Sequence, residues 1–439
     1  MKIKILILSI VLILIIGLAA GVFWWLRRPQ VITFSDDSKL TLLAVDYGKR
    51  HVPPTVKAST TTTGKTPAAR TVRRGNGTFT TSTDTLVLWV RQEYDSQQYH
   101  NFQYYISDKA NTACVETYGR NYGNNRQGNE VVAVQIDSFP RRQGKFIVRV
   151  QENGNGGQEM SDQKFVISNP VRGSFPKWTA EPLPATKEDD DVSVTLTKLV
   201  FGADTSDNRN QADPDDSVNK GVQATFKVSR NGKPVTNWQP VSIDTSDATG
   251  NSVSGDPNCQ WNGDEDVTTY QWGLWSDEPA WKLKLEFSQQ SDFADNEMWN
   301  VQNLPVLPGK QQEMYNYGGN RRQTSTNAPF AEADLNGFHF KLYPAKEFTD
   351  AGQNNWMQGG LFIDASPAVP DGWRMSVKVT DAQTNDVQSS EYNTTQNNNI
   401  SSYRFRLQDI SGLTNLNVSI ALHKSRFVEF TVKPEKGKL

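Results

Sequence analysis

The sequence has little of several things that would point to a particular function. It contains only two cysteines and four histidines, and its formal net charge of −2 gives no strong bias of either sign. A chain without a basic excess is not expected to bind nucleic acid, so we predict no nucleic-acid partner. Long helix-forming stretches are missing after the first 30 residues, while Asn, Thr, Ser, Gln and Gly are abundant. This composition favours strands and turns over helices.

The motifs of common enzyme classes are also missing. The histidines are scattered without metal-ligand spacing, and the chain has no His-Glu-x-x-His sequence. Its Gly-Lys dipeptides lack the upstream glycine and following hydroxyl of a phosphate-binding loop. The segment GNSVSG (250–255) lacks the spacing of a nucleophile elbow. We therefore predict a non-enzymatic protein without catalytic residues or an organic cofactor.

The two cysteines, Cys114 and Cys259, are far apart in the sequence. In an oxidising compartment they can form one disulfide, and otherwise they can be two unrelated buried thiols. Because sequence spacing does not fix the distance between their Cα atoms, both interpretations stay open. No cysteine follows the N-terminal apolar run before Cys114, which excludes a lipoprotein.

The strongest positive signal is the apolar run at the N-terminus. Residues 5–26 carry no charge, and as a helix they span roughly 33 Å, enough to cross a bilayer core of about 30 Å. Lysines precede the run, and two tryptophans followed by two arginines close it. A cleaved signal peptide is the alternative, but the run continues past its small residues. We predict that residues 1–30 are an uncleaved transmembrane signal-anchor and that the C-terminal body lies outside the cytoplasm.

After the anchor, apolar and polar residues alternate in many short segments, such as TDTLVLWV (83–90), WKLKLEF (281–287) and FVEFTV (427–432). This period of two is typical of a strand with one buried face and one exposed face. Clusters of Gly, Asn, Asp and Pro separate the segments, without helical crossovers. The predicted fold is mainly β: an N-terminal transmembrane helix followed by two or three antiparallel β-sandwich domains.

Two internal similarities suggest that the β-domains are repeats. LTLLAVDYG (40–48) is similar to VTLTKLVFG (194–202), and each lies near the start of a strand-rich region. KFVISNP (164–170) is similar to EFTVKP (429–434), and each has the pattern of a last strand ended by proline.

These similarities help to place the domain boundaries. We predict β-sandwich domains over residues 31–172, 173–308 and 335–439, with a linker or long loop over residues 309–334. Within the first domain, residues 48–79 hold several lysines and arginines, no acid, and no apolar pattern. We expect this segment to be a flexible basic loop.

Acidic residues are the best candidates for a metal site. One segment (203–217) is dense in aspartate, and a loop rich in carboxylates can supply the oxygen ligands that Ca²⁺ prefers. The segment lacks the glycine and terminal glutamate of an EF-hand, so a solvated turn is the competing interpretation. The candidate calcium ligands are Asp204, Asp207, Asp213, Asp215 and Asp216.

Four aromatic residues are candidates for binding a ligand such as a sugar ring: Trp261, Tyr270, Trp272 and Trp275. Trp281 begins an apolar face that alternates with the polar residues Lys282 and Lys284, so we assign it to the core. Trp272 and Trp275 are three positions apart and would point to opposite faces of a strand. Packing in the core is the competing interpretation for these aromatic side chains, and it is the commoner one in β-domains.

Together, these features predict a single-pass, membrane-anchored, extracytoplasmic protein that acts in binding, adhesion or envelope scaffolding. Residues 5–26 would contact the membrane, and the partner would be a protein or a glycan outside the cytoplasm. A carbohydrate-binding or carbohydrate-active envelope protein is one alternative. A membrane-tethered cytoplasmic regulator or assembly partner is another.

Overall fold

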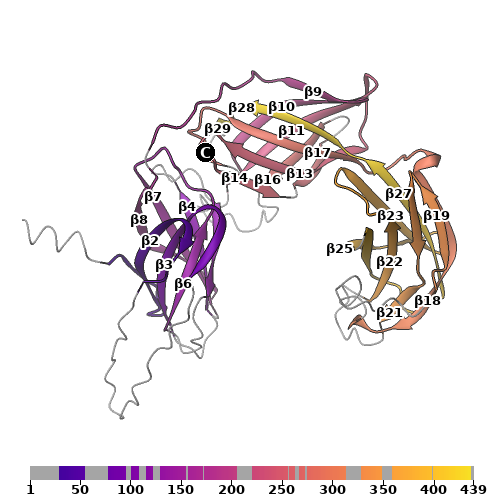
Figure 1. Cartoon of the computed structure of the whole chain (residues 1–439), viewed down its shortest axis with the longest axis horizontal. Coiled ribbons are helices and arrows are strands. Elements are labelled where there is room, and N and C mark those ends of the chain that lie inside the picture. Colours follow the sequence, from indigo (N-terminus) through magenta and orange to yellow (C-terminus); the bar gives the residue numbers. More distant parts are fainter. Residues whose placement is uncertain are drawn as a thin grey trace, which may run out of the picture.

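The computed structural model describes the chain in stretches separated by gaps: residues 29–54, 78–94, 100–107, 115–121, 129–154, 157–171, 173–204, 220–255, 257–262, 266–271, 274–312, 328–348, 358–397 and 399–436. Within these ranges the protein is mainly β, as predicted, and its strands form antiparallel sheets with two short parallel pairings. The strands build three modules that follow one another along an arc (Figure 1). None of the helices in these ranges has the length and apolar character needed to cross a membrane. The predicted anchor segment, residues 5–26, lies outside them.

The first module is one sheet in the order β1-β2-β3-β6-β5-β4-β7-β8. The two edges of this sheet meet, because the Gln30 side chain donates to the Val166 carbonyl at 2.9 Å and accepts from the Val166 N–H at 2.6 Å. The sheet thus curls around buried side chains such as Phe139 and Phe146. Its strands are β1 (Val31–Thr33), β2 (Lys39–His51), β3 (Phe79–Glu93), β4 (His100–Ser107), β5 (Val115–Asn121), β6 (Asn129–Ile136), β7 (Lys145–Gly154) and β8 (Gly157–Ser168).

The expected alternation of buried and exposed residues is wrong for β3. Every residue from Thr85 to Val90 is buried. Val87 and Trp89 form a small apolar cluster on the outer face of the sheet, separate from the main core. The rings of Phe79 and Trp89 are only 6.1 Å apart although they stand well apart along β3, so the strand bends back over this face.

The predicted basic loop is shorter than residues 48–79. Its first residues continue β2 as far as His51, and Phe79 begins β3. The His51 ring is fully buried, with its centroid 4.9 Å from that of Phe79. The middle of the segment, residues 55–77, lies outside the described residues.

The second module consists of two sheets that face each other. One has the order β15-β16-β11-β10-β29, with β9 on β10 and β12 on β11, and the other has the order β14-β13-β17-β28. Edge-to-face ring contacts join the sheets, Phe226 to Phe287 at 5.5 Å and Phe201 to Trp281 at 6.1 Å. The strands are β9 (Ala185–Asp189), β10 (Val192–Asp204), β11 (Lys220–Arg230), β12 (Lys233–Pro234), β13 (Trp238–Asp247), β14 (Ser252–Gly255), β15 (Asn258–Asn262), β16 (Asp266–Gln271), β17 (Trp281–Gln289), β28 (Arg426–Val432) and β29 (Glu435–Lys436).

The third module begins with a short 3₁₀ helix, η1 (Asp295–Glu297), and its strands wrap around an apolar cluster of their own. By contrast, one continuous apolar cluster contains side chains of both the first and the second module. The strands of the third module are β18 (Met298–Gly309), β19 (Ala331–Leu335), β20 (Phe338–Leu342), β21 (Ala345–Phe348), β22 (Gly359–Ser366), β23 (Trp373–Asp381), β24 (Asp386–Val387), β25 (Ser389–Asn397), β26 (Ile400–Leu407) and β27 (Asn415–Lys424).

All three modules repeat one strand order. The series β1-β2-β3-β6-β5 of the first module corresponds to β9-β10-β11-β16-β15 in the second and to β19-β20-β22-β26-β25 in the third. Likewise, the pair β4-β7 corresponds to β13-β17 and to β23-β27. The sequence similarities fall at matching places: 40–48 belongs to β2 and 194–202 to β10, while 164–170 covers the end of β8 and 429–434 the end of β28.

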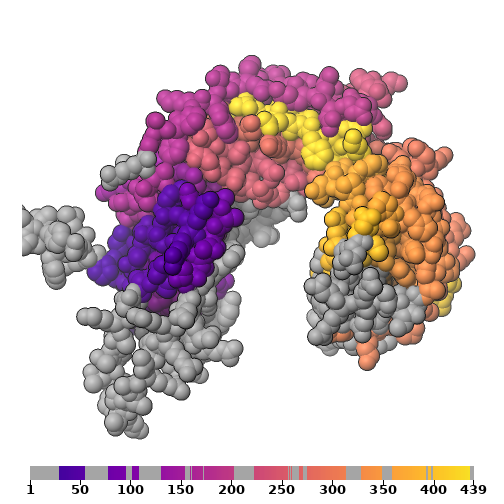
Figure 2. All heavy atoms as spheres, viewed as in Figure 1, coloured from indigo at the N-terminus to yellow at the C-terminus, as the bar shows by residue number. Residues whose placement is uncertain are grey.

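The modules differ in the strand that completes them. In the first module β8 follows β7 directly and pairs with it. The strand after β17 is β18, but it pairs with β27 of the third module. The strand after β27 is β28, and it pairs with β17 of the second module. The second and third modules therefore exchange their last strands, and the yellow C-terminal strands lie in the second module (Figures 1 and 2).

This exchange changes the predicted domain boundaries. Residues 173–308 and 335–439 follow the repeats along the sequence, but each range includes a strand that completes the other module. The expected linker, 309–334, also loses residues to β18 and β19 at its two ends. The arrangement of facing sheets is consistent with β-sandwiches.

Candidate functional site

The structure describes only part of the predicted aromatic platform. Trp275 is 2% exposed and belongs to the shared core, so it offers no ring face to a ligand, and its assignment as a binding residue is wrong. Its carbonyl accepts a hydrogen bond from the indole of Trp281 at 3.1 Å, and Trp281 is a core residue as predicted. Trp261 and Tyr270 lie on β15 and β16, but their side chains, like all of Trp272, are outside the described residues.

Four of the five candidate calcium ligands lie outside the described residues. Asp204 ends β10, and only its backbone is described, whereas Asp207, Asp213, Asp215 and Asp216 lie outside the described ranges.

Cys259 is a free thiol. Its candidate disulfide partner, Cys114, lies outside the described residues. The Cys259 Sγ atom lies 3.2 Å from the Pro240 carbonyl. Burial raises the pKa of this thiol to about 11, so it stays protonated at neutral pH.

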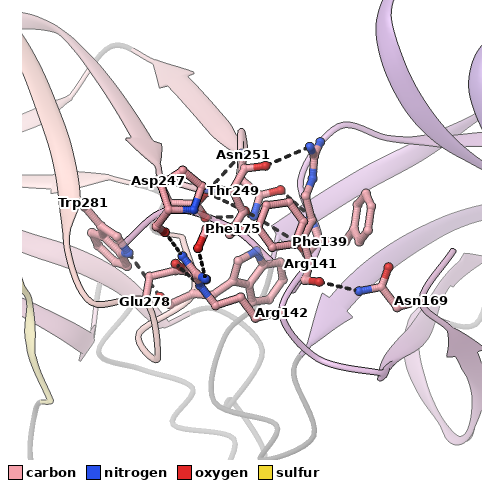
Figure 3. A network of polar contacts seen from close by, with 12 residues as sticks. Phe139, Arg141, Arg142, Asn169, Phe175, Asp247, Thr249, Asn251, Glu278 and Trp281 are labelled. Atoms are coloured by element: carbon pink, nitrogen blue, oxygen red, sulfur yellow. Dashed lines mark hydrogen bonds and ion pairs between the residues drawn. The ribbon is translucent and has the colours of Figure 1, made fainter. Parts of the chain in front are cut away.

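The most extensive buried polar contacts lie where the modules meet. The first joint connects the loop between β6 and β7 to the turn between β13 and β14 (Figure 3). The Phe139 N–H donates to Asn251 Oδ1 at 3.1 Å, and Asn251 Nδ2 donates back to the Phe139 carbonyl at 3.0 Å. Ser138 Oγ donates to the Ser252 carbonyl at 2.8 Å. Because Phe139 and Asn251 are fully buried, these bonds replace water at the centre of the joint.

An ion pair with a buried glutamate and a partly exposed arginine lies beside this contact in the first joint. Arg142 Nε donates to both carboxylate oxygens of Glu278, at 3.0 and 2.8 Å, and Glu278 is 3% exposed. The Arg142 guanidinium also lies over the Phe175 ring, 5.7 Å from its centroid. Burial raises the pKa of Glu278, and the nearby charges of Asp247 and Asp277 add to the rise despite Arg142.

The turn of the first joint is held by a single carboxylate. Asp247 Oδ1 accepts from the Thr249 N–H at 2.8 Å and from the Asn251 N–H at 3.2 Å, while Oδ2 accepts from Asn251 Nδ2 at 2.8 Å. Gly250 has a φ of +90°, and a Cβ atom there would lie 3.2 Å from Arg141 Nη1. The sequence DATGN thus forms the tight turn that the loop of the first module contacts.

The second joint connects the second and third modules. Glu286 of β17 is 8% exposed and accepts two hydrogen bonds from Arg374 of β23, at 2.7 and 2.5 Å. Ser288, two residues further along β17, makes a hydrogen bond of 2.7 Å with Nε2 of His423 on β27. The ring of Phe293 lies against that of His423, with centroids 4.9 Å apart.

Just beyond the second joint, β28 is held by the acidic turn between β9 and β10. Arg426 Nη2 donates to Asp191 Oδ1 at 2.6 Å, and Arg230 Nε donates to Asp191 Oδ2 at 2.5 Å. The Phe427 N–H donates to Asp189 Oδ2 at 2.8 Å. The carboxylates of KEDDD (187–191) therefore fix the returning chain to the second module.

The pKa values of three groups at or beside the second joint are all lowered. At neutral pH these shifts favour an uncharged His423 and ionised Glu286 and Asp191. Burial lowers the pKa of His423 to about 4, and the charges of Arg374 and Arg426 lower it further against the opposing charge of Glu286. Burial alone would raise the pKa of Glu286, but hydrogen bonds and charge from Arg374 outweigh it and the pKa is lowered. Burial acts in the same way at Asp191, where Arg426 and Arg230 outweigh it and lower the pKa.

The contact between Ser288 and His423 resembles two members of a hydrolase triad. Both side chains are 2% exposed, so a substrate has no access to the hydroxyl. The second ring nitrogen, Nδ1, is buried without a hydrogen-bond partner, whereas a triad needs a carboxylate there. The nearby carboxylate of Glu286 is engaged by Arg374 instead. This geometry is that of an interface between modules.

Sequence patterns gave little indication of either joint. Glu286 and Ser288 occupy positions of β17 that alternation assigns to the exposed face, and they are buried because the third module packs there. The KEDDD cluster is a visible signal in the sequence, but it indicates acidic chemistry rather than a contact with a distant arginine. No family model and no curated protein matches this chain.

Proposed function

We propose that this protein is a non-enzymatic scaffold or adhesion protein that an N-terminal membrane anchor holds outside the cytoplasm. The observation that carries the proposal is the construction of the two joints. Each joint combines buried hydrogen bonds with an arginine–glutamate ion pair between neighbouring modules, bifurcated from Arg142 at the first joint and bidentate from Arg374 at the second. Such contacts hold three β-modules at fixed angles, which suits a spacer that presents a surface at a set position.

The burial of Trp275 and of the serine–histidine contact supports this proposal over the carbohydrate-active alternative. The apolar segment over residues 5–26 supports the membrane anchor. A partner would be a protein or glycan reached by the end of the arc that is far from the anchor.

The location is tested by digesting a C-terminal tag with protease on intact cells, with lysed cells as the control. We expect digestion in intact cells, after selective permeabilisation of an outer membrane where one exists. Protection that persists until the inner membrane is lysed would contradict an extracytoplasmic body and favour the tethered cytoplasmic alternative.

The scaffolding role is tested by loosening one joint at a time. Asn251→Ala and Arg374→Met should reduce binding or adhesion of cells that display the protein at wild-type level. Asn385→Ala is the matched control, since Asn385 lies in a similar but exposed turn within the third module. Wild-type binding or adhesion in both joint variants would show that the function does not need a fixed arrangement of the modules.

A further inference from the structure

The three modules show that one fold accepts its last strand from two sources. In the first module β8 forms a hairpin with β7, closed by the pairing of Gly154 with Gly157. In the second module the same position beside β17 is filled by β28, which comes from beyond the whole third module. The position beside β17 is therefore filled without a direct turn from β17.

The place that receives β28 is built mainly by the second module, although the Phe427 ring at its start also lies against Gly372 of the third module. β28 pairs with β17 from Trp281 opposite Val432 to Phe287 opposite Arg426. On its other side, the Glu181 N–H donates to the Thr431 carbonyl at 2.7 Å. Three apolar side chains of β28, those of Val428, Phe430 and Val432, are at most 6% exposed, whereas Phe427 on the opposite face is 52% exposed. Any strand with this sequence would make the same contacts, whichever chain it belongs to.

The connection that carries β28 across is short. β27 ends at Lys424 and β28 begins at Arg426, which leaves Ser425 as the single residue between a strand of the third module and a strand of the second. A strand on a short connection between two modules is the element that domain swapping exchanges, because only the connection changes conformation.

We propose that β28 and β29 also exchange between two copies of this chain, so that the C-terminal strand of each copy completes the second module of the other. The partner is thus a second copy of this chain, and the contacts of β28 within the second module would be unchanged. The proposal goes beyond the scaffold function, since it adds a self-assembly surface, and it does not depend on the side of the membrane.

The exchange is tested by a disulfide that can form only across β17 and β28. Lys284 and Glu429 are opposite each other in these strands, and both side chains are partly exposed. Two full-length chains are co-expressed, one carrying Lys284→Cys and the other Glu429→Cys, with Cys114 and Cys259 replaced by serine in both. We expect an oxidised heterodimer that is absent when either variant is expressed alone.

A matched pair in the first module controls for random collisions. Arg149 and Lys164 are opposite each other in β7 and β8, where the last strand stays in its own hairpin. Chains carrying Arg149→Cys and Lys164→Cys separately should give no heterodimer. Equal heterodimer from both pairs would overturn the proposal, because it would show contact without strand exchange.

A chain carrying both Lys284→Cys and Glu429→Cys verifies that the two positions can be bridged. If this double variant forms its disulfide within one chain while the co-expressed single variants form none, strand exchange is restricted to one chain and the proposal fails. This result would leave the location and adhesion tests of the proposed function unaffected.

Discussion

The two joints hold modules of the same strand order by different means. At the first joint the chain crosses once, and the apolar core continues from one module into the other around Phe139. At the second joint the chain crosses twice, each module keeps a separate core, and the contact relies on charged and polar pairs. The first joint thus resembles the interior of one domain, whereas the second resembles an interface that two exchanged strands hold together.

Deleting β28 and β29 should cause the largest loss of stability among the changes that test this comparison of the joints. A chain ending at Lys424 loses the buried side chains of Val428, Phe430 and Val432, a cost of roughly 6 kcal/mol or more at about 2 kcal/mol each. We expect the second module to unfold although the deletion lies beyond the third in sequence, while the first stays protected. Hydrogen exchange measured by mass spectrometry reports each module separately. Loss of protection in the third module alone would contradict the exchanged topology.

Acid should weaken the second joint more than the first. The pKa of His423 is about 4 in the folded protein against an ordinary 6.5, so its neutral form contributes stability above pH 6.5 that is lost as the pH falls towards 4. The full loss is about 3 kcal/mol. The lowered pKa of Glu286 adds a further loss at still lower pH. At the first joint, the raised pKa of Glu278 gives the opposite sign, since that contribution is greatest at low pH and is lost as the pH rises.

This pH asymmetry is measured by following the protection of each module between pH 7.5 and pH 4.5. His423→Phe combined with Ser288→Ala should remove most of the acid sensitivity of the second joint. His339→Gln is the control, because His339 is exposed and its raised pKa depends on Asp334 and Glu332 within the third module. An unchanged pH profile in the double variant would show that His423 does not set it.

Removing one ion pair at a time should loosen a different module in each case, which distinguishes the two joints. Arg374→Met leaves the buried carboxylate of Glu286 without its bidentate partner and should cost about 2 kcal/mol. Arg142→Met likewise removes the cationic partner of Glu278. Urea unfolding with per-module hydrogen exchange should show the third module loosened by the former and the first module by the latter. Equal loosening of both modules in each variant would mean that the joints are coupled.

The smallest effect we predict compares two similar turns. Asn251 in DATGN and Asn385 in DAQTN make the same hydrogen bonds to the aspartate that starts each turn, but Asn251 is buried in the first joint and Asn385 is exposed. Asn251→Ala should cost about 1–2 kcal/mol and Asn385→Ala well under 1 kcal/mol. Thermal melting of the two variants measures the difference, and equal losses would assign the effect to the turn rather than to the joint.

The fold class could be predicted because alternation reports a local property, the burial of one face of each strand. The same pattern does not report what covers the outer face, so it failed for Val87 and Trp89 in β3 and for Glu286 and Ser288 in β17. It also does not specify strand partners, and FVEFTV gives the same alternation beside β27 or beside β17. The similarity of KFVISNP to EFTVKP did indicate that both are last strands, but not which module each one completes.

The exchanged strands also set an order of events at the ribosome. The first module has all of its strands once residue 168 has been made, so it can fold while the rest of the chain is still being synthesised. The second module must wait with an open edge beside β17 until residues 426–432 emerge, after every strand of the third. While residues 290–425 are being made, the chain therefore exposes an unpaired strand edge beside β17, and chaperone protection or rapid translation over this interval would limit aggregation.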